Sequence, residues 1–179
     1  MTMAVSGVAQ ERLSKRFDKW DVDKNGVLEP ADFAAEAAKI ARAFGETPES
    51  AKGAQLHKGF LAMFETLAKR AGVAPQGPID RTQFLEAAGE VIKGGAATFN
   101  PVLGPVTKGI VALADKNGDG VIDEAEFATW LQALGLSKSE ARAAFKQIDT
   151  DNSGTLSEDE LLDAVRLFHL GESDVELLG

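Results

Sequence analysis

The stretch Asp115–Glu126, which reads DKNGDGVIDEAE, places oxygen-bearing side chains at regular positions. Carboxylates or an amide occupy its first, third, fifth, ninth and twelfth places. Gly120 stands at the sixth place, where a sharp backbone bend suits a residue without Cβ. Oxygens in this arrangement are the ligands that calcium prefers. The predicted ligands are Asp115, Asn117, Asp119, the carbonyl of Val121, Asp123 and Glu126.

A simpler interpretation explains part of this stretch. Asp123 and Glu126 also have the spacing of a capping box, which starts a helix and needs no ion. A capping box does not require acidic or amide side chains at the three earlier ligand places. Without a cation, so many carboxylates would repel one another. We therefore favour ion binding, and the stretch resembles the twelve-residue calcium loop of EF-hand proteins.

Two further windows repeat the pattern. The first reads DVDKNGVLEPAD and the last reads DTDNSGTLSEDE. The first window ends in aspartate, one methylene shorter than glutamate, so we expect it to tolerate Mg²⁺ best of the three. The first set of predicted ligands is Asp21, Asp23, Asn25, the carbonyl of Val27, Glu29 and Asp32. The last set is Asp149, Asp151, Ser153, the carbonyl of Thr155, Ser157 and Glu160.

A fourth window, Gly72–Gln83, has the central glycine and the apolar residue of the motif but lacks its early ligands. It reads GVAPQGPIDRTQ, with Gly77 at the bend and Ile79 two places later. Its first, third and fifth places hold no carboxylate, so we expect no ion there. An apolar residue also follows the glycine of each other window by two places, namely Leu28, Ile122 and Leu156. We expect these residues to pair the loops in short two-stranded contacts, with the fourth window serving as a structural partner for the first loop.

The segments between the loops carry apolar residues at helical spacing. We therefore predict an all-α protein with four EF-hands in two paired lobes, the second hand being degenerate. Gly94-Gly95 separates a predicted N-terminal pair (1–93) from a C-terminal pair with its tail (96–179). Asn100-Pro101 resembles the start of the helix that leads to Asp115. The stripes include Leu13, Phe17 and Trp20; Phe33, Ala37 and Ile40; Phe60, Met63, Phe64 and Leu67; Phe84, Ala88 and Val91; Phe127, Trp130, Leu131 and Leu134; Ala141, Ala144, Phe145 and Ile148; Leu161, Ala164 and Val165.

Composition excludes several classes of function. The formal charge of −9, from 28 acidic and 19 basic residues, argues against nucleic acid and against an anionic membrane surface. The chain has no cysteine, its N-terminus lacks the pattern of a secretion signal, and no apolar run is long enough to span a bilayer. We expect a cytoplasmic monomer. No catalytic motif is present, and the two histidines are expected to be helix residues rather than bases, so we do not expect an enzyme.

The whole chain resembles the calerythrin and sarcoplasmic calcium-binding protein family of compact four-hand proteins. The stretches that carry the resemblance are KRFDKWDVDKNG in the first hand, LGPVTKGIVALADKNGDG before the third loop, and the ending DVELLG. The resemblance implies calcium at the first, third and fourth hands, on the three ligand sets given above. It also implies two closely packed lobes and a role as an intracellular calcium buffer or transporter.

Two questions stay open on the residues alone. The chain could be a buffer, or a sensor that opens a groove for a target protein. Sensor grooves tend to be rich in methionine, and this chain has three, so the buffer is favoured. The tail from Glu172 ends in Val175, Leu177 and Leu178. It is either frayed or covers a groove of a lobe.

Overall fold

The computed structural model describes residues 7–133 and 135–178. Outside the described residues lie residues 1–6, Leu134 and Gly179. Residues 1–6 belong to the N-terminus where we expect no secretion signal, and Leu134 belongs to one of the predicted stripes. The described part is helical, as predicted, and its helices are α1 (Gly7–Trp20), α2 (Pro30–Ala43), α3 (Ala51–Ala71), α4 (Arg81–Lys93), α5 (Ala96–Ala114), α6 (Glu124–Ala133), α7 (Lys138–Ile148) and α8 (Glu158–Leu170). None of these helices combines the length and the apolar character that crossing a membrane requires.

Four short strands join the loops in pairs. They are β1 (Val27–Leu28), β2 (Ile79–Asp80), β3 (Ile122–Asp123) and β4 (Thr155–Leu156). β1 pairs antiparallel with β2, and β3 with β4, so that Leu28 faces Ile79 and Ile122 faces Leu156. All four of these side chains are fully buried. The predicted role of the fourth window, as a partner for the first loop, is confirmed. The two strand pairs hold each loop at a fixed distance from its partner.

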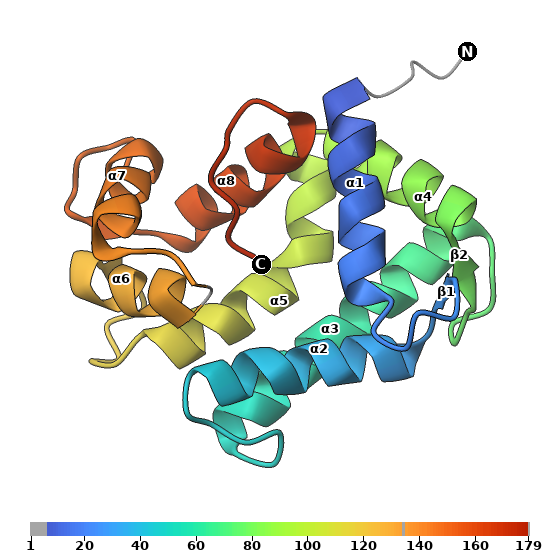
Figure 1. Ribbon diagram of the computed structural model, residues 1–179, viewed down its shortest axis with the longest axis horizontal. Helices are drawn as coiled ribbons and strands as arrows, with labels where there is room; N and C mark the ends of the chain where they lie inside the picture. Colours follow the sequence, from blue (N-terminus) through green and yellow to red (C-terminus); the bar gives the residue numbers. More distant parts are fainter. Residues whose placement is uncertain (1–6, 134, 179) are drawn as a thin grey trace.

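The predicted apolar stripes form one continuous core that runs through both halves of the chain. In the N-terminal half, Phe33 lies at the centre of an aromatic cluster, with its ring centroid 5.0 Å from that of Trp20 and 5.1 Å from that of Phe64. Figure 1 shows β1 and β2 at one end of the molecule and α6 and α7 at the other. α4 ends at Lys93 and α5 begins at Ala96, on either side of Gly94-Gly95. The division into two pairs at this point stays a prediction.

The start of α5 differs from our expectation. The helix begins at Ala96, with Gly95 as its N-cap, and it contains Pro101 and Pro105 within its length. A proline inside a helix removes one backbone hydrogen bond and usually kinks or ends the helix. Here the side chains around the two prolines are buried, including Phe99, Val102 and Val106. Packing of this face against α3 and α8 therefore offsets the local cost, which the sequence pattern did not reveal.

α5 meets α3 at two glycines. A Cβ at Gly59 would lie 2.5 Å from the carbonyl oxygen of Pro105, and one at Gly109 would lie 2.9 Å from the Cα of Leu56. Real Cβ atoms do not approach backbone this closely, so each glycine allows the helices to touch. Because α3 belongs to the second hand and α5 to the third, these contacts join the two halves of the chain.

We expect Gly59→Ala to lower the free energy of unfolding by about 2 kcal/mol, because the added methyl group pushes α3 away from α5. Gly104→Ala in α5 is the matched control, since nothing lies within 4 Å of its Cβ position. That variant should gain about 0.5–1 kcal/mol from helix propensity. Urea denaturation of both variants measures the difference. Equal stability of the two would contradict the close approach.

The C-terminal tail folds back onto α1. Leu177 and Leu178 are 2% and 6% exposed, so the tail covers a groove, and the alternative of a frayed end is wrong. Ion pairs hold it in place: Glu176 Oε1 lies 2.7 Å from Arg16 Nη2 and 2.9 Å from Lys19 Nζ. Arg12 adds a contact 3.0 Å long to Asp174 and donates to the carbonyl of Ser173. The helix α1 and residues 173–178 therefore form one structural unit (Figure 1).

His169 of α8 lies buried beneath this contact. Its Nδ1 lies 2.8 Å from the carbonyl oxygen of Val165, and its Nε2 accepts a hydrogen bond from Arg16 Nε at 3.2 Å. The imidazole must therefore be neutral, with its proton on Nδ1. Burial, and next the charge of Arg16, lower the pKa of His169 to about 3. The prediction that it is a structural helix residue agrees with this position.

Mild acid should therefore destabilise the protein through His169. The unfolded chain, in which the pKa of histidine is about 6.5, takes up the proton first, so stability is lost as the pH falls below that value. By pH 5 the expected loss is about 2 kcal/mol. The measurement is urea denaturation between pH 7.5 and pH 5, with His169→Gln as a variant that does not titrate. A pH dependence that persists unchanged in this variant would assign the effect to another group.

Candidate metal centres

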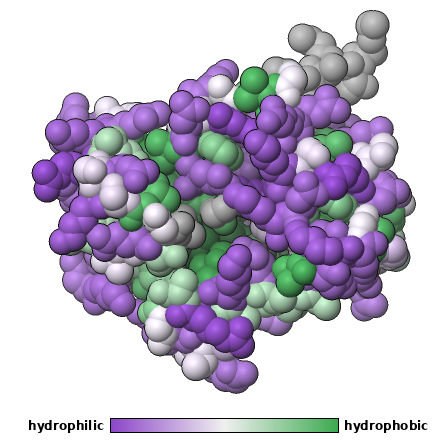
Figure 2. Space-filling view, in the orientation of Figure 1, coloured by the Kyte–Doolittle hydropathy of each residue, from purple (hydrophilic) through white to green (hydrophobic). Residues whose placement is uncertain are grey.

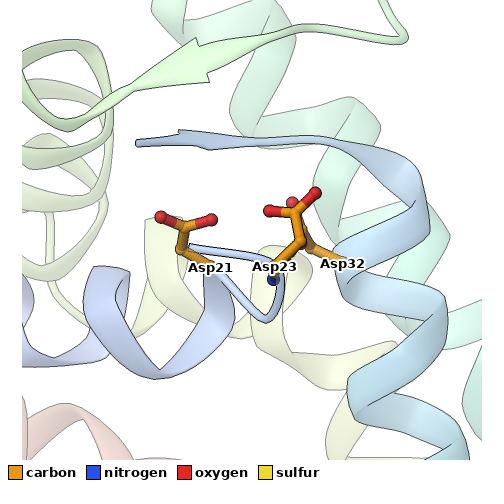
Figure 3. Close-up of side chains that lie close together, drawn as sticks. All are labelled: Asp21, Asp23 and Asp32. Carbon is orange, nitrogen blue, oxygen red and sulfur yellow. Dashed lines mark hydrogen bonds between the residues drawn. The ribbon is translucent and has the colours of Figure 1, made fainter. Parts of the chain in front are cut away.

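Three clusters of carboxylates form where the sequence predicts ligands. They are Asp21, Asp23 and Asp32; Asp115, Asp119 and Glu126; and Asp149, Asp151 and Glu160. Within each cluster, one oxygen from every residue lies within 4.8 Å of the others. The members come from the end of one helix, the loop and the first turn of the next helix. In the first cluster, the carboxylates of Asp23 and Asp32 lie together and that of Asp21 lies beside them, on the same side of the loop (Figure 3). The structure thus brings together nine of the predicted ligand residues.

The first aspartate of each loop is held by backbone N–H groups. Gly26 donates to Asp21 Oδ2 at 2.9 Å, Gly120 to Asp115 Oδ2 at 2.8 Å, and Gly154 to Asp149 Oδ2 at 3.0 Å. Each of these glycines has a positive φ, between 80° and 86°, which L side chains rarely adopt. The sixth-place glycine therefore bends the loop and also fixes the first carboxylate.

The twelfth residue of each loop is also bound to backbone. Glu126 Oε1 accepts from the N–H of Asp123 at 3.0 Å and Oε2 from that of Lys116, while Glu160 does the same with Ser157 and Thr150 at 3.0 Å each. These donors stand at the ninth and second places of their loops. The twelfth carboxylate therefore spans the loop and closes it.

Asp32 makes a looser closure. Its Oδ2 accepts from Glu29 N–H at 2.9 Å, but Oδ1 reaches only the N–H of Asp23, at 3.5 Å. Asp32, which is one methylene shorter than glutamate, thus accepts from the backbone N–H at the third place of its loop. The glutamates of the other two loops accept from the N–H at the second place.

The remaining predicted ligands lie in the loops but outside the carboxylate clusters. Glu29 Oε1 accepts from Asn25 Nδ2 at 2.7 Å, and Asp123 Oδ1 accepts from the N–H of Glu126 at 2.8 Å. Ser153 Oγ donates to the carbonyl of Thr155 at 2.8 Å, and Ser157 Oγ caps α8 at Glu160 N–H. Asn117 Oδ1 accepts from the N–H of Asp119, and Val27 and Val121 donate their own N–H groups to Asn25 and Asp119. The ninth-place side chains therefore serve the loops and helix starts in this structure.

The protonation equilibria differ between the loops. Burial raises the pKa of Asp23, and the nearby charges of Asp32 and Asp21 act in the same direction. Burial also acts to raise the pKa of Asp115, but hydrogen bonds from Gly120 and Gly118 outweigh it and hold the pKa below its usual value. A hydrogen bond from the side chain of Ser153 lowers the pKa of Asp151. The backbone N–H of Ser153, which donates to Asp151 Oδ1 at 3.1 Å, acts in the same direction. Asp23 of the first cluster therefore holds its proton more readily than an isolated aspartate, whereas Asp115 and Asp151 of the other two clusters hold theirs less readily.

The second hand supplies no carboxylate cluster among the residues that the structure describes. Asp80 caps α4 instead, because its Oδ1 accepts from the N–H of Gln83 at 2.8 Å. This position agrees with the absence of early carboxylates in the sequence of that window.

The donor chemistry of the three clusters fits a hard divalent cation. Each offers three carboxylates from a single short loop, with amide, hydroxyl or carbonyl oxygens beside them, and none offers sulfur or imidazole. Oxygen-only ligand sets of this kind suit Ca²⁺ and Mg²⁺ rather than transition metals. Sequence reasoning missed the backbone N–H groups of Lys116 and Thr150. No side-chain pattern could have revealed them, because every residue except proline carries such a donor.

Comparison with known proteins is consistent with this geometry. A family model described as an EF-hand domain pair matches residues 118–166, which run from the third loop into α8. Calerythrin from Saccharopolyspora erythraea is 52% identical over 175 residues, which cover 97% of this chain and 99% of that protein. The similarity therefore extends over both halves.

Solved structures show the same fold. One is the structure of a Streptomyces coelicolor calcium-binding protein, which is described in connection with prokaryotic calcium-mediated regulation. It matches with a TM-score of 0.71 and 28% identity, over 90% of this chain and 98% of its own. Calcium-loaded apo-aequorin from Aequorea victoria matches with a TM-score of 0.70 and 18% identity, over 96% of this chain and 93% of its own. At that identity, the second likeness concerns the fold alone.

Proposed function

Because the chain belongs to the calerythrin family of EF-hand proteins, we propose that it binds three calcium ions and serves as an intracellular calcium buffer. The observation that carries this proposal is the presence of a carboxylate cluster in each of three loops, with the first and twelfth residues of the loop in every cluster. The family is one of EF-hand proteins and not of enzymes, in agreement with the absence of catalytic motifs. We further propose that the protein is a cytoplasmic monomer.

The ligand sets of the proposal are those that the sequence predicts for the first, third and fourth hands. The first and third loops each offer four carboxylates, counting Glu29 and Asp123 at the ninth place, but the third loop closes with Glu126 rather than the shorter Asp32 and should bind most tightly. The fourth offers Asp149, Asp151 and Glu160 with two hydroxyls, and so carries less charge. Affinity in such loops depends on the number of charged ligands and on rigidity.

Calorimetric titration tests the stoichiometry, with three ions expected for the unchanged protein. The triple variant Asp21→Asn, Asp115→Asn, Asp149→Asn should lose most calcium binding, because each loop loses its first carboxylate. Asp80→Asn is the matched control, because it removes a carboxylate from the second hand and leaves an oxygen to cap α4. Three ions bound by the triple variant, or two by the control, would refute the assignment.

The short side chain of Asp32 predicts a different ion preference at the first loop. We expect Asp32→Glu to raise the preference for calcium over magnesium about tenfold, which corresponds to about 1.4 kcal/mol. A glutamate can offer both oxygens to the larger ion, whereas magnesium demands a tight octahedron. The reverse exchange, Glu126→Asp, should lower the preference at the third loop. Calcium titrations with and without magnesium measure both ratios, and unchanged ratios would refute the argument.

The burial of the helix faces supports a buffer. Among the described residues, the only large hydrophobic side chains classed as exposed are Val8 and Val22. A sensor would offer an apolar groove when calcium binds, whereas here the tail already covers one with Leu177 and Leu178. The protein should therefore change little in shape between its states.

A calcium sensor is the second candidate, favoured by the Streptomyces coelicolor protein that is described with calcium-mediated regulation. The two functions differ in what calcium exposes. Retention on a phenyl matrix in calcium, with release by a chelator, would favour the sensor. Equal retention in both conditions, with an unchanged radius of gyration in small-angle scattering, would favour the buffer.

A further inference from the structure

A recess opens where the two halves of the chain meet. Its volume is about 360 Å³, at the lower end of the range for small-molecule sites. Figure 2 shows hydrophobic surface in a hollow near the centre of this face, with hydrophilic side chains around it. The wall and floor come from α2, α5, α6 and the tail, and the apolar members are Ile40, Ala43, Phe44, Ile110, Trp130, Ala133, Leu177 and Leu178.

The charged side chains of this recess have the opposite sign to the chain as a whole. Among the described residues, Lys19, Lys24 and Lys39 line it together with one acidic side chain, that of Glu36, whereas the whole chain carries −9. Lys19 is paired with Glu176 and Lys24 donates to the carbonyl of Asp18. Lys39 is exposed and takes part in none of the ion pairs found among residues 7–133 and 135–178. The rim of the recess therefore attracts an anion.

Glu36 is the unusual member of the wall. The residue is only 6% exposed, and its carboxyl group takes part in none of the ion pairs found among residues 7–133 and 135–178. Its oxygens are not among the fully buried side-chain atoms without a partner, so they reach the recess. A largely buried carboxylate is less well hydrated than one at the open surface, so protonation or a ligand that supplies a hydrogen bond stabilises it. Burial raises the pKa of Glu36, against the opposing charges of Lys39, Arg16 and Lys19. A protonated carboxyl group can donate a hydrogen bond to a bound oxygen.

We propose that this recess binds a small amphiphile with an anionic head group, of the alkyl carboxylate class. The apolar chain would lie on Ile110, Trp130 and the two leucines of the tail, and the carboxylate would lie at the rim beside Lys39 with Glu36 as a hydrogen-bond partner. The recess shares Lys24 with the first loop but includes none of the proposed ligand residues, and the proposal does not depend on the calcium stoichiometry.

The test is calorimetric titration of the full chain with decanoate, at free calcium low enough to keep the calcium soap dissolved. Decyltrimethylammonium and decanol serve as cationic and neutral probes with the same chain. We expect saturable binding of one decanoate below its micelle-forming concentration, with quenching or shift of tryptophan emission, and weaker binding of both other probes. Equal affinity for the three probes, or no saturable binding of decanoate, would overturn the proposal.

Variants place the ligand within the recess. Lys39→Gln should weaken decanoate binding about fivefold, in line with the loss of a single exposed charge pair. Ala43→Phe, at an exposed position on the wall, should block the recess and abolish binding while leaving the melting temperature nearly unchanged. Lys146→Gln on α7 is the matched control and should bind decanoate normally. Unchanged binding by Ala43→Phe would place the ligand elsewhere and refute the assignment.

Discussion

Calcium at about a hundred times its Kd is expected to raise the free energy of unfolding by about 8 kcal/mol, because each of three sites contributes about 2.7 kcal/mol when only the folded chain binds. For a chain of this length, the melting temperature should rise by about 20 °C. The physical reason lies in the three clusters, where carboxylate oxygens stand within 4.8 Å of one another. A bound cation converts their mutual repulsion into attraction. Calorimetric melts in calcium and in chelator measure the effect.

The triple variant with asparagine at Asp21, Asp115 and Asp149 provides the control. It keeps an oxygen near the backbone N–H groups of the sixth-place glycines but removes one charge from each cluster. Its melting temperature in calcium should approach that of the unchanged protein in chelator, or exceed it slightly, because less repulsion remains. Superimposable melts of the unchanged protein in calcium and in chelator would contradict binding at all three loops.

Removal of the tail by ending the chain at Gly171 should lower the free energy of unfolding by about 5 kcal/mol. Leu177 and Leu178 are both buried, and the transfer of each to water costs about 1.5–3 kcal/mol. The deletion also takes away Glu176, which leaves Arg16 without that ion-pair partner; the Arg16 side chain is only 3% exposed. Urea denaturation at fixed, saturating calcium measures the loss.

Single substitutions separate the two contributions to this loss. Glu176→Gln keeps the leucines and should cost about 1–2 kcal/mol, since the carboxylate side chain is 30% exposed and its pairing is partly screened. Asp174→Asn is the matched control, because the side chain of Asp174 is fully exposed, and it should change stability by less than about 0.5 kcal/mol. A truncated chain as stable as the full one would show that the tail does not pack in solution.

The sequence predicted the features that are local in the chain. Loop spacing predicted the carboxylate clusters, and the apolar residue after each glycine predicted the pairing of Leu28 with Ile79 and of Ile122 with Leu156. These patterns are readable because a turn, a short strand and a helix start each depend on a few neighbouring residues.

Contacts between distant residues could not be predicted in the same way. Arg16 is 153 residues away from His169 and 160 away from Glu176 in sequence, and only the complete fold brings it to them. The predicted start of α5, at Asn100-Pro101, was wrong for a related reason. The helix begins at Ala96, because burial against other helices outweighed the local effect of Pro101 and Pro105. Tertiary packing decided both the contacts of Arg16 and the start of α5, and no local sequence pattern predicts such packing.

The attachment of the tail to α1 bears on how the protein matures in the cell. Residues 172–178 are synthesised long after α1, so α1 lacks the segment that covers it until that stretch has emerged from the ribosome. The N-terminal half therefore reaches its final packing only once the tail has been synthesised, although its first loop is made early.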